Sequence, residues 1–222
     1  MNFEPEAYSL RWYRQMVGIS SIGDTTVVTN KWMLGTRNSF FIGIVATLLA
    51  TALGTVAALG LSRPHMPFKA VFMAILISPM IVPLIITAAG MFFFYSKIGL
   101  THTYLGLILA HTALGTPFVV ITVTATLTGF DTNLIRASQS LGADTMRTFF
   151  KVIMPLILPG VISGALFAFI TSFDEVVVVM FVGSVEQITI PKQMWAGLRQ
   201  ETSPVILCMA TCLVALSIAL LT

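Results

Sequence analysis

Two adjacent carboxylates, Asp174 and Glu175, interrupt an otherwise apolar run and are the residues of this sequence best suited to chemistry. Carboxylates in a membrane segment are costly to bury and commonly face a cavity or a partner. A carboxylate attracts an ammonium group, so the pair predicts a site that a cationic solute occupies in passing. The alternative is an ion pair between one or both carboxylates and a Lys or Arg of a neighbouring subunit.

A semi-polar stretch, residues 131–159, is the second candidate site. Asp131 and Asp144 are each placed to cap a short helix, and Gly142 between them can take the left-handed conformation that ends the first helix. The spacing predicts that the second helix runs until Pro155 and Pro159 limit its continuation. A first helix of about nine residues is not stable alone in water, so the stretch is expected to pack against a partner.

The elements that position both sites are predicted to be membrane-spanning helices. Hydrophobic residues make up 56% of the 222 residues and charged residues only 9%, and the mean hydropathy is +0.93. A soluble fold could not cover its surface with so few charges. The net charge of +3 is small and the basic residues are scattered, so nucleic acid is not an expected partner.

Five apolar blocks reach the length of ~20 residues that a helix needs to cross a bilayer. They are residues 39–61, 70–96, 98–130, 152–183 and 202–222. Their continuous apolar character, without strand-like alternation, predicts helices. The predicted fold class is therefore an all-α membrane protein with about five spans.

Two patterns inside these blocks predict how the helices pack. Pro79 and Pro83 remove two backbone donors and predict a kink, either beside a pathway or within an ordinary bundle. A strip of small residues in the first block would let helix backbones approach closely. The alternative is that small residues are simply common in membrane helices. The strip consists of Ala46, Ala50, Gly54 and Ala58.

The charged loops predict the orientation. The link 62–69 and the stretch 131–159 lie on the same side of the membrane if every block spans once. Both carry a basic excess, which marks the cytoplasmic side. Residues 1–38 are then expected to be a periplasmic segment, and residues 39–222 the transmembrane domain.

The stretch 131–159 resembles the cytoplasmic EAA loop of permease subunits in binding-protein-dependent ABC importers, and we call it the EAA-like loop. The family pattern is Glu-Ala-Ala, three residues, Gly, nine residues, then an Ile-x-Leu-Pro-like ending. The matching positions are Ala137, Gly142, Val152, Met154 and Pro155. Arg136 replaces the Glu and Ser138 replaces the second Ala, which puts one ionic contact in doubt. The resemblance implies an ATPase-coupling set of Arg136, Ala137, Ser138, Leu141, Gly142, Ala143 and Pro155.

The segment around the carboxylates, SFDEVVVVMFVG, resembles the S-x-D-[DE]-V-V-V segment of the spermidine/putrescine permease subfamily. That resemblance implies that Phe173, Asp174 and Glu175 line the substrate pathway. Residues 189–200 resemble the subfamily's external helix, and residues 3–16 resemble the periplasmic stretch before its second helix. Since family permeases usually have six helices, we expect the first to be absent from this sequence; a natural five-helix protein is the alternative.

The resemblance implies a type I ABC importer transmembrane subunit in a bacterial inner membrane, in contact with lipid. Its expected partners are a second permease subunit, an ATPase dimer and a periplasmic substrate-binding protein. The chain has no Gly-x4-Gly-Lys-[Ser/Thr] phosphate loop, so ATP and Mg are expected on the partner ATPase. We expect no catalytic residue, metal site or cofactor here. The rival hypotheses are a proton-coupled secondary transporter and a membrane scaffold without transport.

Overall fold

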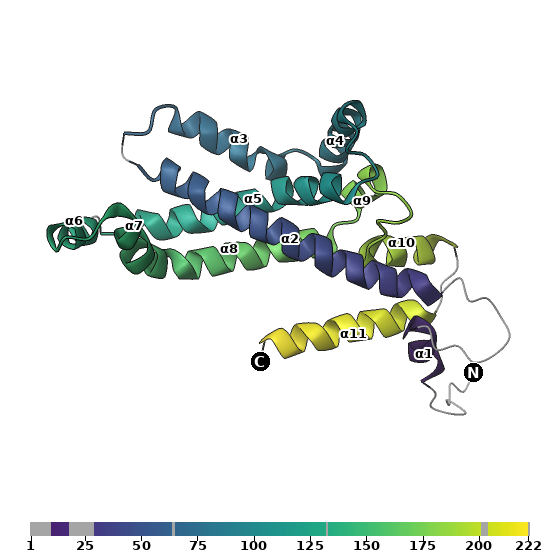
Figure 1. Ribbon diagram of the computed structural model, residues 1–222. Helices are drawn as coiled ribbons and strands as arrows, with labels where there is room; N and C mark the ends of the chain where they lie inside the picture. Colours follow the sequence, from purple (N-terminus) through teal and green to yellow (C-terminus); the bar gives the residue numbers. More distant parts are fainter. Residues whose placement is uncertain (1–9, 18–28, 64, 132, 201–203, 222) are drawn as a thin grey trace.

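The computed structural model describes residues 10–17, 29–63, 65–131, 133–200 and 204–221 (Figure 1). Every regular element in these ranges is a helix, which confirms the all-α prediction. Three long helices pack against one another at the centre of the molecule: α2 (Thr29–Leu61), α5 (Tyr104–Thr128) and α8 (Met154–Asp174).

The other helices flank this centre. They are α1 (Arg11–Val17), α3 (Lys69–Ile81), α4 (Leu84–Ile98), α6 (Asn133–Ser140), α7 (Thr145–Thr148), a π-helix (Phe149–Ile153), α9 (Val177–Val182), α10 (Ile190–Gln200) and α11 (Pro204–Leu221). The short helix α9 packs against α4, and α1 packs against α11. The loop helices α6 and α7 lie at the end of the molecule opposite α10 and α1 (Figure 1).

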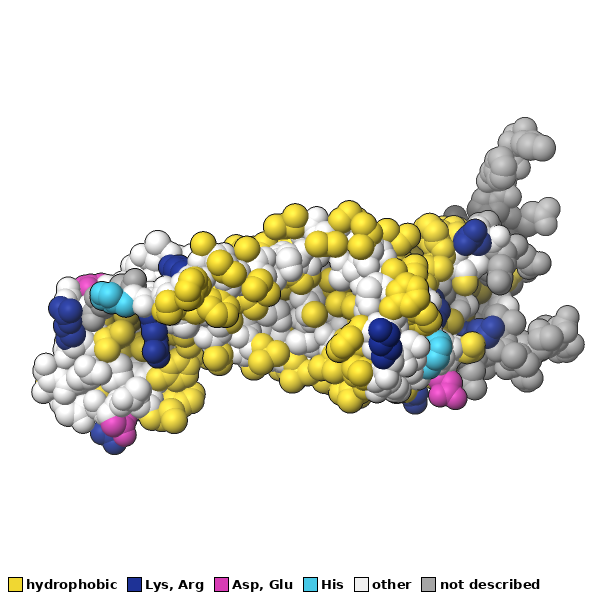
Figure 2. All heavy atoms as spheres, turned by 90° about the horizontal axis from the view of Figure 1, so that it is seen from above, with side chains coloured by type: hydrophobic (Ala, Val, Ile, Leu, Met, Phe, Trp, Pro, Cys, Tyr) yellow, Lys and Arg dark blue, Asp and Glu magenta, His cyan; other side chains and the backbone are white. Residues whose placement is uncertain are grey.

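By length and apolar composition, three helices of the described residues can cross a bilayer: Lys31–Leu61, Tyr104–Thr128 and Thr145–Asp174. The bent pair of α3 and α4 adds a fourth if it counts as one span. The fifth predicted span corresponds to α11, whose apolar part, Pro204–Ala215, is shorter. Figure 2 shows hydrophobic side chains over the middle of the molecule and Lys and Arg toward both ends, as a surrounding bilayer requires.

The first long helix begins at Thr29, well before the apolar block that predicted it. Its polar first turns are held by packing, because Trp32 is buried in a cluster with Ile190 and Val205. The expected N-terminal segment is therefore helical from Thr29 onward and also over Arg11–Val17, while residues 1–9 and 18–28 lie outside the described residues.

The strip of small residues on α2 is a packing surface, as predicted. Ala46, Ala50 and Ala58 are all buried. A Cβ added to Gly54 would lie 2.6 Å from Cβ of Val119 on α5, so the two helices meet where a larger side chain has no room. Such close approach gives helices the van der Waals contact that holds them together in lipid.

The second apolar block is broken rather than merely kinked. Helix α3 ends at Ile81 and α4 begins at Leu84, with an angle of 104° between them. Val82 is extended at φ −72° and ψ 133°, which is the conformation that a following proline favours. Pro83 therefore makes the break, while Pro79 lies within α3 without ending it.

The second helix of the EAA-like loop was expected to end near Pro155, before the fourth apolar block. This prediction was wrong. One helix runs from Thr145 through the π-helix and Pro155 to Asp174. In the π-helix the N–H of Met154 bonds to the carbonyl of Phe149. Pro155, which has no N–H, lies directly after the π-helix, at the point where the hydrogen-bond pattern of the helix changes.

The prediction for this block was also wrong at its C-terminal end, because the helix does not continue to residue 183. It stops at Asp174, since Glu175 is extended at φ −72° and ψ 122°. The chain resumes as the separate six-residue helix Val177–Val182. The carboxylates thus mark a break in a helix instead of lying within one.

Candidate functional site

The predicted caps of the EAA-like loop are present. The N–H of Asn133 donates to Oδ1 of Asp131 at 2.9 Å, which begins α6. The N–H of Arg147 donates to Oδ1 of Asp144 at 2.7 Å, which begins α7. Each carboxylate therefore satisfies a donor that the first turn leaves free.

The turn between α6 and α7 has the left-handed glycine that the sequence predicts. Gly142 has a φ of 83°, in the left-handed region. Its N–H donates to the carbonyl of Gln139 at 2.9 Å, and the N–H of Ala143 donates to the carbonyl of Ser138 at 3.0 Å. This pair of bonds is the Schellman motif that ends many helices.

The loop presents an exposed apolar surface on a fixed frame. The hydroxyls of Ser138 and Thr148 lie 2.9 Å apart and join α6 to α7. Leu141 is 88% exposed and Met146 66% exposed, on either side of the glycine turn. Arg136 is exposed as well. No described residue of this chain covers this surface, so it is available to a partner.

Six residues of the predicted coupling set thus lie together at one end of the molecule. They are Arg136, Ala137, Ser138, Leu141, Gly142 and Ala143. Pro155 lies apart from them, in the first turn of α8. Its connection to the loop is the continuous helix that begins at Thr145.

The two carboxylates have different surroundings. Glu175 is 6% exposed, and its Oε1 accepts the N–H of Val178 at 2.8 Å, which caps the start of α9. Asp174 is exposed. Within the described part of the chain, neither carboxylate forms an ion pair with a Lys or Arg. Asp174 is therefore exposed without a cationic partner among the described residues, whereas Glu175 is held by the backbone at the start of α9.

A cavity of about 340 Å³ lies at the break between α8 and α9. Its lining residues are Leu84, Ile170, Thr171, Asp174, Glu175, Val176 and Val177. Leu84 is the first residue of α4, directly after the break at Pro83. The two breaks of the chain therefore meet at one cavity, and irregular backbone at membrane depth is tolerated where it lines such a space.

Phe173, the third residue predicted for the pathway, lies among aromatic side chains. Its ring centroid is 5.2 Å from that of Phe40 and 5.4 Å from that of Phe169. It packs against the cluster that contains Trp32 and is not among the residues that line the cavity. In this conformation Phe173 contributes packing behind Asp174.

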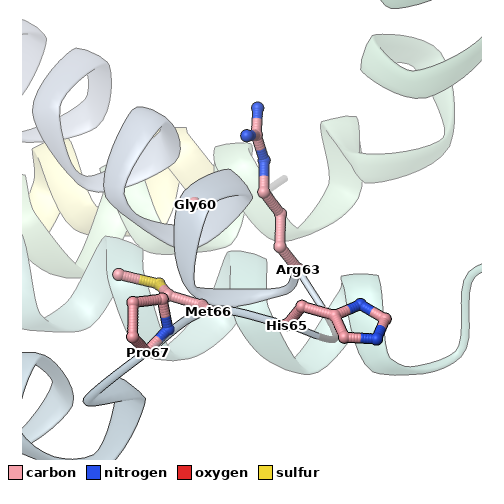
Figure 3. A pocket seen from close by; sticks show the side chains of 5 residues that line it. All are labelled: Gly60, Arg63, His65, Met66 and Pro67. Carbon is pink, nitrogen blue, oxygen red and sulfur yellow. The ribbon is translucent and has the colours of Figure 1, made fainter.

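A second cavity, of about 560 Å³, lies at the end of the molecule that carries the EAA-like loop. It is lined by Gly60, Arg63, His65, Met66 and Pro67 in the link between α2 and α3 (Figure 3). In Figure 3 the side chain of Arg63 points upward from the link, His65 points to the right, and Met66 and Pro67 lie together on the left. Its lining holds basic groups and no carboxylate, so it does not suit a cationic solute.

The model of the family described as "Binding-protein-dependent transport system inner membrane component" matches residues 50–222. The chain belongs to this family. It is 29% identical to the spermidine/putrescine transport system permease protein PotC of Haemophilus influenzae, over 97% of this chain and 80% of that protein. PotC of Escherichia coli K12 is 26% identical over 97% and 78% of the two chains. The putrescine permease PotI of the same strain is 27% identical over 92% and 72%.

Membership of this family establishes a multi-pass transport permease and confirms the resemblance drawn from the EAA-like loop and the carboxylate segment. The matched range contains the loop, both helix breaks and the cavity. It also begins at Ala50, inside the small-residue strip on α2 that packs against α5. Both candidate sites therefore lie within the range that the family model matches.

Sequence reasoning missed the contribution of α4 to the cavity and the polar contacts of Lys192. Pro83 indicates the change of direction before α4, but from the sequence it predicts only a kink. Lys192 gave no signal, because its partners are main-chain carbonyls of Val179 and Ser184. His111 is buried and its Nδ1 lies 2.7 Å from Oγ of Ser172, so its ring joins α5 to α8.

Proposed function

We propose that this chain is the membrane-spanning permease subunit of an ATP-driven importer that moves a small cationic solute, such as a polyamine, into the cytoplasm. The observation that carries the proposal is the cavity at the two helix breaks, with the exposed Asp174 and the buried Glu175 in its wall. The names of PotC and PotI, both polyamine permeases, support the same class of cargo.

The carboxylates suit transient binding of an ammonium group. At ~4 Å a unit charge pair is worth about 1 kcal/mol in water and about 4 kcal/mol near a protein surface. Asp174 is exposed and therefore belongs near the lower value. An attraction of this size draws a cation into the cavity without trapping it, which is what passage requires.

Coupling to ATP hydrolysis is proposed to run through the EAA-like loop. Leu141 and Met146 would dock into an ATPase subunit, since they are large apolar side chains exposed at the loop's end. The helix from Thr145 to Asp174 contains 30 residues and joins this loop directly to the carboxylates. A displacement of the loop by the ATPase dimer would therefore be carried along one continuous helix to the cavity.

The remaining partners follow from the family. A second permease subunit would complete the pathway around the cavity, and a periplasmic binding protein would deliver the solute. The exposed cation Arg136, where the family pattern has Glu, favours acidic groups on the ATPase surface. ATP and Mg would be bound by the ATPase alone. The proposed location is the bacterial inner membrane, with the EAA-like loop on the cytoplasmic side.

The test is uptake of labelled putrescine and spermidine by the complete transport system in proteoliposomes. Uptake that requires the ATPase subunits, ATP and the binding protein is the expected result. Uptake driven by a proton gradient without ATP would establish a secondary transporter instead. An assembled, ATP-hydrolysing complex that moves neither amine nor any other cation would refute the proposed cargo class.

A further inference from the structure

Lys192, on helix α10, makes an unusual set of contacts. Its ammonium donates to the carbonyl of Val179 at 3.2 Å and to the carbonyl of Ser184 at 3.1 Å. The side chain is half-buried, and burial lowers the pKa of its ammonium. Within the described residues it forms no ion pair with a carboxylate. Among the described residues, the polar contacts of this ammonium are therefore with main-chain carbonyls.

The two carbonyls lie at the C-terminal end of α9. Val179 is in the last turn of this helix, and Ser184 follows its end at Gly183. The carbonyl of Val179 also accepts the N–H of Gly183 at 3.1 Å, and Ser184 lies just beyond the helix. The C-terminal end of a helix nevertheless carries partial negative charge. An ammonium is therefore well matched to this position. Lys192 caps α9 from a different element of the chain.

The opposite end of α9 is held by Glu175, whose Oε1 accepts the N–H of Val178. This short helix thus has a carboxylate at its N-terminal end and an ammonium at its C-terminal end, in the favourable orientation for both. A helix of six residues has no stability of its own. Its position is set by these two end contacts and by the packing of its buried valines.

The packing makes α9 a rigid connection. Val178, Val179 and Val182 are fully buried, and they belong to one apolar cluster with Leu107 of α5 and Ala88 of α4. Six helical residues span about 9 Å. Any shift of Lys192 along α9 would therefore move Glu175, because a packed element of this length does not compress.

Helix α10, which carries Lys192, is an exposed amphipathic element at the end of the molecule opposite the EAA-like loop (Figure 1). Its outer residues include Trp195, 46% exposed, and Leu198, 59% exposed. Its first N–H, that of Ile190, donates to Oγ of Ser39 at 2.9 Å. The helix is therefore anchored at its start and open to a partner along its outer face.

We propose that Lys192 is a positioning residue of the transport pathway: its ammonium links α10 to α9 and so fixes where the carboxylates at the cavity stand. This inference rests on the proposed function, since it assigns the carboxylates to the passage of a cation. A displacement of α10 would therefore be transmitted through Lys192 and α9 to Glu175. The cavity is therefore connected to both ends of the molecule. Lys192 and α9 connect it to α10, and the helix Thr145–Asp174 connects it to the EAA-like loop.

The test compares Lys192→Met with the wild type in the complete transport system. Loss of hydrogen bonds from a charged donor is expected to lower uptake roughly tenfold. ATP hydrolysis should stay near the wild-type rate, because the EAA-like loop is untouched, so the amount of solute moved per ATP falls. Lys192→Arg keeps the charge and the donors and should recover most of the uptake. Lys97→Gln, which removes an exposed cation at the end of α4, is the control and should transport normally.

A double-mutant cycle separates positioning from general stability. If Lys192 acts through Glu175, adding Lys192→Met to Glu175→Gln should lower uptake little further. If the two sites are independent, their fold-losses in uptake should multiply. Should Lys192→Met lower the amount of assembled complex, Lys192→Gln, which keeps a donor for one carbonyl, gives the decisive uptake measurement.

Three results would overturn the inference: wild-type uptake per ATP in the Met and Gln variants, multiplicative losses in the cycle, or no recovery with Arg. With any of these three results, normal amine uptake by the wild type would still support the proposed function. Failure of the wild type to move amines would instead refute the proposed function.

Discussion

At the residue scale, the two adjacent carboxylates are not equivalent. Glu175 is buried and its oxygen is committed to the N–H of Val178 at the start of α9. Asp174 is exposed in the cavity wall and has no cationic partner among the described residues. The sequence shows only two adjacent acidic residues. If both lay within one helix, they would differ only in the direction of their side chains. Because α8 ends at Asp174, Asp174 lies in the cavity wall, while Glu175 caps the start of α9.

Asp174→Asn is therefore expected to raise the KM for uptake of a cationic amine while the complex assembles normally. Removing the charge and keeping the size deletes an attraction of about 1 kcal/mol or more, or about fivefold in apparent affinity. Uptake of labelled amine over a concentration series measures it, beside a pull-down of the second permease subunit. Asp174→Glu, which keeps the charge, is the control. An unchanged KM in the Asn variant would remove Asp174 from the pathway.

At the element scale, local features were predictable and tertiary ones were not. The caps at Asp131 and Asp144 and the turn at Gly142 depend on a few neighbouring residues, so the sequence located all three. The π-helix before Pro155 depends on how a long helix packs, and its effect on the proline was missed. The break at Pro83 was predicted as a kink, since sequence alone does not give the angle.

Gly142→Pro is expected to uncouple ATP hydrolysis from uptake without removing the protein from the membrane. Proline fixes φ near −65°, whereas Gly142 requires 83°, and it deletes the N–H that bonds to Gln139. The angle between α6 and α7 would change, and with it the surface formed by Leu141 and Met146. Co-purification of the ATPase and uptake are measured together.

The control for this substitution is Gly142→Asn, which tolerates the left-handed region and keeps the N–H. It should retain most of the activity. Wild-type uptake in the Pro variant would show that this turn is not part of the coupling element.

Gly164→Leu tests the packing of the central helices. A Cβ at this position would lie 2.8 Å from Cα of Val119, so α8 and α5 would have to separate. Overpacking of this kind costs about 1–3 kcal/mol, and a lower melting temperature in detergent is the expected result. Gly90→Ala on α4, where nothing lies within 4 Å of the added Cβ, is the matched control. Equal melting temperatures for the two variants would contradict the close approach of α5 and α8.

At the scale of the whole molecule, the arrangement has polar ends, an apolar middle and a cavity at the two helix breaks. The link between α2 and α3 and the EAA-like loop lie at the same end, as the distribution of basic residues predicted (Figure 1). The number of spans was less predictable, because apolar length does not reveal whether a block is straight. The blocks at 70–96 and 152–183 both contain breaks, and these breaks form the cavity.

Single cysteines at the two ends test this arrangement. With native Cys208 and Cys212 replaced by Ala, Leu141→Cys should react with a membrane-impermeant thiol reagent in inverted vesicles but not in intact cells. Val185→Cys, 78% exposed in the turn after α9, should behave in the opposite way. Because the EAA-like loop is proposed to dock on the ATPase, assembly with that subunit should protect Leu141→Cys and leave Val185→Cys reactive. Labelling of both from one side would refute the predicted orientation, and equal reactivity of Leu141→Cys with and without the ATPase would place docking elsewhere.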